Sequence, residues 1–95
     1  MARYNRNINV KHYNSVGEIL DSVNNDPKQP GYQIVYLDRL AGNFNTRNAW
    51  VDHLVASGYS FEDVVEKRPK IGREEYIALI VQATPEQALA LKICF

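Results

Sequence analysis

Residues 76–89 read YIALIVQATPEQAL. The first six are apolar at every position, which predicts a strand over residues 75–83 with both faces buried. In the following TPEQ, threonine suits the N-cap, proline suits the first helical position, and glutamine completes a capping box. The end of the chain is therefore predicted as a buried strand followed by a helix over residues 85–95.

Two more strands and a helix are predicted earlier in the chain. Residues 6–13 alternate in polarity, which is typical of a strand with one wet face. A Ser-x-x-Glu capping box then begins a helix over residues 15–25. Its apolar stripe consists of Val16, Ile19, Leu20 and Val23. Residues 32–37 are apolar on both faces, so we expect a central strand, reached from the first by a right-handed crossover.

The middle of the chain is predicted to be helical. Thr46 suits the cap of a helix over residues 46–57, which ends near Gly58. Ser60 begins a short second helix that includes Val64 and Val65. The basic residues 67–73 are predicted as an exposed turn whose charges tolerate reversal.

These elements predict one domain over residues 1–95 with the order β-α-β-α-α-β-α. The fold class is α+β, in two layers, with a small three-stranded sheet covered on one face by the helices near 15–25, 46–57 and 85–95. The predicted core consists of Ile19, Leu20, Val23, Ile34, Trp50, Leu54, Leu79, Val81, Leu91 and Phe95.

Composition excludes several classes of protein. Of the 95 residues, 45% are hydrophobic and 23% are charged, as in ordinary globular chains, and eleven basic residues balance eleven acidic ones. This balance argues against a DNA mimic and against a histone-like polycation. No membrane-length apolar run and no secretory leader is visible, and Cys94 is the only cysteine, so we expect a cytoplasmic protein without disulfides.

Enzyme motifs are missing from the sequence. It has no glycine-rich phosphate loop, no paired metal-ligand motif and no nucleophile elbow. Cys94 with His53 or His12 as its base is the one nucleophilic pair to consider, but a helical cysteine among apolar residues is more typical of packing. Neighbouring Asp52 and His53 diverge by about 100° on a helix. We therefore predict a protein that is not an enzyme and that has no cofactor and no metal site.

Nucleic-acid binding is an alternative. Residues 50–73 resemble a helix-turn-helix, but Glu62 and Asp63 lie where such a reader would meet phosphates. The basic and aromatic N-terminal strand could instead bind RNA or single-stranded nucleic acid.

The N-terminal strand is the predicted contact surface for a partner. An edge strand presents unpaired backbone donors and acceptors, and here lysine is the main protection of that edge. Tyrosine and arginine are also the side chains that protein interfaces favour. The predicted partner-binding residues are Arg3, Tyr4, Arg6, Asn7, Asn9, Lys11 and Tyr13.

The strand of residues 76–81 followed by the capped TPEQAL helix resembles the ending of small accessory proteins of tailed bacteriophages. This resemblance covers about the last fifth of the chain and carries no functional residues. It implies a virus-encoded protein in the host cytoplasm that binds and inhibits or modulates a host protein, or binds a virion protein. A virion structural or decoration subunit that self-assembles as a homo-oligomer is the alternative from another class, and no membrane partner is expected.

Overall fold

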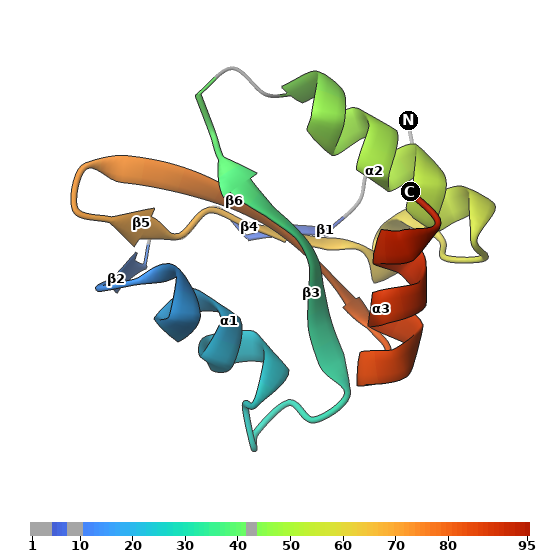
Figure 1. The fold of residues 1–95 in the computed structure, drawn as a ribbon, viewed down its shortest axis with the longest axis horizontal. Helices are drawn as coiled ribbons and strands as arrows, with labels where there is room; N and C mark the ends of the chain where they lie inside the picture. The colour runs from blue at the N-terminus through green and yellow to red at the C-terminus, as the bar shows by residue number, and fades with distance from the viewer. Residues whose placement is uncertain (1–4, 8–10, 42–43) are drawn as a thin grey trace.

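The computed structural model describes residues 5–7, 11–41 and 44–95, and it confirms the α+β class (Figure 1). Its elements are, in chain order, β1 (Asn5–Asn7), β2 (His12–Tyr13), α1 (Val16–Asn24), β3 (Tyr32–Arg39), α2 (Phe44–Ala56), the 3-10 turn η1 (Phe61–Asp63), β4 (Val65–Lys67), β5 (Lys70–Ile71), β6 (Glu74–Gln82) and α3 (Pro85–Ile93). Within these ranges no helix has the length and apolar character needed to cross a membrane.

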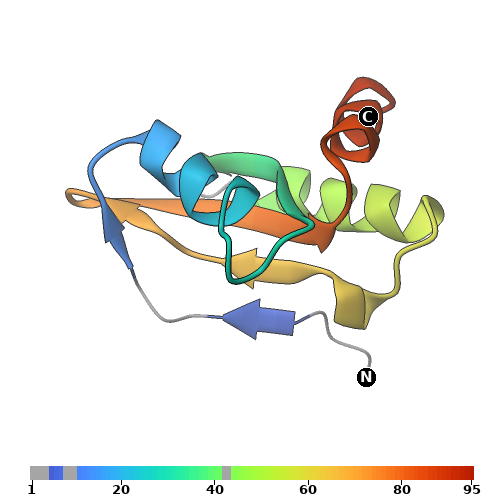
Figure 2. The same cartoon turned by 90° about the horizontal axis from the view of Figure 1, so that it is seen from below.

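The sheet is built around β6. β3 pairs with one edge of β6, and β4 and β5 pair with the other edge, all antiparallel. Outside them, β1 runs parallel to β4 and β2 runs parallel to β5. Figure 2 shows the resulting succession of β1, β4, β6 and β3. The prediction of three strands in the order β-α-β-α-α-β-α was wrong, because the described sheet has six strands, two of them before α1 and three between α2 and α3.

Two of the extra strands come from the segment expected to form a second helix and an exposed turn. Only residues 61–63 are helical, and Val65 already pairs with Ile80 of β6. The β-branched Val64 and Val65 favour an extended chain, and Pro69 would break a helix continued past them. The helix that the Ser60 capping box predicted is therefore a single turn followed by β4 and β5.

Helices cover both faces of the sheet, so the predicted two-layer arrangement was also wrong. The side chains of β6 alternate between two clusters of buried residues. Ile77, Leu79 and Val81 pack in the first cluster, on the side of α2 and α3, whereas Ala78 and Ile80 pack in the second cluster, under α1. Figure 1 shows α1 on one side of the β3–β6 pair and α2 and α3 on the other.

This layering also corrects the position of the strand at residues 32–37. β3 pairs with β6 alone among the described strands, so it lies at an edge rather than at the centre. Both its faces are apolar because α1 covers Ile34 while the other helices cover Val35 and Tyr36. A β-bulge between Ile34 and Tyr36 shifts the register at this point.

The predicted caps and core mostly agree with the structure. The Thr84 hydroxyl accepts from the Gln87 N–H at 3.1 Å and the Gln87 side chain accepts from the Thr84 N–H at 2.9 Å, which confirms that capping box. At the start of α1, Ser15 caps the Glu18 N–H, but the Glu18 carboxylate accepts from the backbone of Asn14. Seven of the ten predicted core residues are buried: Ile19, Val23, Ile34, Trp50, Leu54, Leu79 and Val81.

The remaining three predicted core residues lie farther out. Leu20 and Leu91 are partly buried against the two clusters. Phe95 is 54% exposed, so placing it in the core was wrong, although its ring stacks on Trp50 at a centroid distance of 4.4 Å. Phe95 lies beyond the end of α3, and its ring also meets the His53 ring edge-on at a centroid distance of 5.5 Å.

Candidate binding site

The N-terminal strands form the outer edge of the sheet. Among the described strands, β1 has only β4 as a neighbour and β2 has only β5. The backbone N–H of Lys70 donates to the carbonyl of Lys11 at 2.9 Å, so the peptide groups of Lys11 point inward. Because successive residues of a strand point their peptide groups to opposite sides, the N–H and C=O of His12 point away from β5.

The structure describes only part of the predicted contact set. Arg3, Tyr4 and Asn9 lie outside the described residues. Arg6 and Asn7 belong to β1, where they pair in register with Glu66 and Lys67 of β4. These two residues therefore lie on the predicted edge.

Lys11 is exposed as expected, but Tyr13, expected on the contact surface, is turned toward the interior. Tyr13 is half-buried against the second cluster, and His12 is exposed. The reason is that α1 begins at Val16 and returns over the face that carries Tyr13. Tyr13 is thus available to a partner only in part.

A cavity of about 280 Å³ opens under α1, beside these residues. We call it the α1 cavity. Its apolar wall comes from the second cluster, and its polar wall includes side chains from β2, from the β4–β5 link and from the C-terminal end of α1. The lining residues are Lys11, Tyr13, Ile19, Ser22, Val23, Asp26, Ile34, Lys67, Arg68, Pro69, Ala78 and Ile80. The cavity therefore brings together Lys11 and Lys67, which the sequence placed in two separate basic clusters.

A buried carboxylate lies on the opposite face of the sheet. Glu66 is 1% exposed, and its two oxygens accept from Arg68 Nε at 2.9 Å and from Arg47 Nη1 at 3.3 Å. Both guanidinium groups also lie over the Phe44 ring, at 4.7 Å for Arg47 and 5.8 Å for Arg68. We call Phe44, Arg47, Glu66 and Arg68 the Glu66 cluster. Sequence reasoning missed it, because Arg47 lies 19 positions before Glu66 and no local pattern joins the two.

Tyr36 borders this cluster. Tyr36 and Glu66 both pair in register with Leu79, so the three residues form one row across β3, β6 and β4. Burial raises the pKa of the Tyr36 hydroxyl, the charge of Asp38 and a hydrogen bond to it raise the pKa further, and the nearby Arg47 lowers it. Because its pKa is raised, the Tyr36 hydroxyl stays neutral beside the paired charges of the Glu66 cluster.

The exposed turn predicted over residues 67–73 was wrong over residues 67–71, because Lys70 and Ile71 form β5 and only Gly72 and Arg73 are exposed. Lys67 belongs to β4, Arg68 is bonded to Glu66, and Pro69 is buried. Charge changes at adjacent positions should consequently differ in their effects.

We expect Arg68→Gln to lower the free energy of unfolding by about 1–3 kcal/mol, because it leaves a buried carboxylate short of a charged donor. Lys67→Gln, the matched control, should stay within about 0.5 kcal/mol. Urea denaturation followed by circular dichroism measures both values. Equal losses in the two variants would contradict this role of Arg68.

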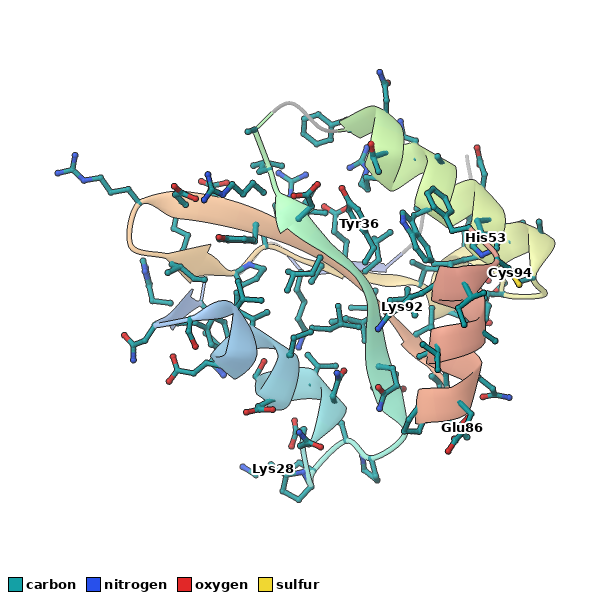
Figure 3. All side chains as sticks on the ribbon, in the orientation of Figure 1. Lys28, Tyr36, His53, Glu86, Lys92 and Cys94 are labelled. Atoms are coloured by element: carbon teal, nitrogen blue, oxygen red, sulfur yellow. The ribbon has the colours of Figure 1, made fainter. Side chains whose placement is uncertain are left out.

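The nucleophilic pair considered from the sequence does share one surface hollow. His53 and Cys94 both line a hollow of about 270 Å³ between α2 and the end of α3 (Figure 3). His53 Nε2 lies 2.9 Å from the Leu91 carbonyl, which only accepts, so this nitrogen carries a proton. That nitrogen is therefore not a base for the exposed Cys94 thiol. Asp52 is exposed and His12 lies on β2.

Within the described part of the chain, no group of three or more His, Cys, Asp or Glu side chains could hold a metal ion. Comparison with models of known protein families, with curated proteins and with solved structures found no match to the chain. The resemblance to phage accessory proteins stays a prediction.

Proposed function

We propose that this chain is a non-enzymatic protein-binding domain whose partner adds an extended segment to the outer edge of β2 and β1. The observation that carries the proposal is the His12 peptide, which points outward from a strand with one described neighbour. Recognition by strand addition uses such backbone groups for affinity and neighbouring side chains for specificity. Exposed Lys11 and half-buried Tyr13 are among the described side chains available beside that edge.

The setting that we propose is a phage accessory protein that inhibits or modulates a host protein. A short binding domain needs no cofactor for this role, since occupying the partner's surface is sufficient. A partner strand at β2 would also satisfy the backbone groups that an edge otherwise leaves to water.

His12→Pro tests the edge. Proline removes the outward N–H and places a ring in the path of an incoming strand, while edge positions whose N–H faces outward tolerate it. We expect the affinity for a partner, first captured from the native host and identified by mass spectrometry, to fall about tenfold or more. Calorimetric titration of the purified pair measures the change.

The matched control is His12→Ala, which changes the same side chain but keeps the N–H, and it should bind within about twofold of the parent, as surface truncations outside hot spots usually do. Circular dichroism should show the parent fold in both variants. If a folded His12→Pro protein binds its partner like the parent, the outer edge is not the contact surface.

A further inference from the structure

The α1 cavity has the two parts of a small-ligand site, an apolar wall and cationic side chains. Ile19, Ile34 and Ala78 are at most 2% exposed, so they form a rigid wall within the second cluster. Ligand pockets in proteins are mostly apolar, with a few polar groups that orient the ligand. We propose that the α1 cavity binds a short aliphatic chain with an anionic head, the chain against this wall and the head at Lys11 and Lys67.

Charge supports an anion rather than a neutral ligand. Among the described residues, neither Lys11 nor Lys67 forms an ion pair with a carboxylate. Arg68 also lines the cavity, but its Nε is bonded to Glu66. The one acidic side chain of the lining, Asp26, accepts the backbone N–H of Lys28 at 2.8 Å. The cavity therefore offers two ammonium groups to an incoming anion.

The size of the cavity limits the length of the ligand's aliphatic chain. An apolar cavity of about 150 Å³ holds a benzene-sized molecule. The α1 cavity, at about 280 Å³, accepts a ligand larger than benzene but not a long acyl chain. Octanoate and octyl phosphate are suitable probes because they share a chain and differ in the anionic head, and octanol is the neutral counterpart.

NMR titration of the full chain tests the proposal. We expect octanoate, octyl phosphate or both to cause saturable shifts in the methyl resonances of Ile19, Ile34 and Ile80. The two probes together show whether a carboxylate or a phosphate head is preferred. A lack of saturable shifts with both anions would overturn the proposal.

Variants test the role of charge. The double variant Lys11→Gln, Lys67→Gln should bind the preferred anion about fivefold or more weakly, while its affinity for octanol changes less than twofold. Lys28→Gln is the matched control, because Lys28 is an exposed lysine on the loop after α1 and does not line the cavity (Figure 3). Equal anion affinity in the double variant and in the parent would overturn the assignment of the head group.

A third variant tests where the ligand's aliphatic chain lies in the cavity. Ser22 is half-buried on α1 and lines the cavity, so Ser22→Leu should fill part of the space and abolish the shifts. Ala78→Val fills the cavity from the β6 side, and it replaces Ser22→Leu in this test if Ser22→Leu does not fold. Retained binding in a folded filled variant would contradict the site. Since these titrations need no protein partner, their failure is distinct from failure of the strand-addition proposal.

Discussion

Replacing Glu66 by alanine should lower the free energy of unfolding by about 3–5 kcal/mol. The carboxylate is 1% exposed and is bonded to both Arg47 and Arg68, whose side chains are only 14% and 24% exposed. Its removal takes away the carboxylate to which both guanidinium groups are bonded in this poorly hydrated site. Urea denaturation measured by circular dichroism gives the loss.

Glu62→Ala provides the matched control, because Glu62 is exposed on η1 and the change in composition is the same. It should change the free energy of unfolding by no more than about 0.5 kcal/mol. If Glu66→Ala costs no more than this control, the Glu66 cluster contributes nothing to the fold. Glu66→Gln should be intermediate, because the amide oxygen still accepts a hydrogen bond while the negative charge is lost.

Leu79→Ala should lower the free energy of unfolding by about 2–5 kcal/mol. Leu79 is 0% exposed and lies in the middle of β6, with β3 on one side and β4 on the other. The lost methyl groups leave a cavity that the paired backbone on both sides prevents from closing. The same denaturation measurement gives the value.

Leu89→Ala is the control for the size of the truncation, because Leu89 is 57% exposed on α3. Its expected effect is within about 0.5 kcal/mol. A Leu79→Ala loss as small as that of Leu89→Ala would reject β6 as the central strand.

Local signals predicted α1 and α3 well, whereas Thr46, the expected cap of the helix over residues 46–57, lies inside α2, which begins at Phe44. Ser15 and Thr84 cap α1 and α3 as expected, because a cap depends on residues three positions away. The strands β3 and β6 were also predicted, since a continuous apolar run is itself a local signal. The layering was not predicted, because the sequence of an apolar strand is the same whether neighbouring strands or two helices bury it.

Pairing between distant segments explains the other misses. Residues 64–71 contain a valine pair that suits a helix or a strand, and only β6 as an available partner selects the strand. The burial of Glu66 depends on Arg47 from α2, which no local pattern of residues around Glu66 could indicate. The same holds for the α1 cavity, which Lys11 and Lys67 both line although they lie far apart in the sequence.

The central position of β6 sets the order in which the chain can fold. β6 follows every other strand in the sequence, and β3, β4 and β5 all pair directly with it. During synthesis, β1, β2 and β3 therefore emerge before the strand that organises them exists. Until β6 is available, the apolar segment of β3 has no strand to pair with. Exposed apolar segments of this kind are prone to aggregation, and chaperones protect them from it. The sheet is consequently completed only once β6 is available, by contacts between residues far apart in the chain, which slows folding relative to a helical domain of similar size.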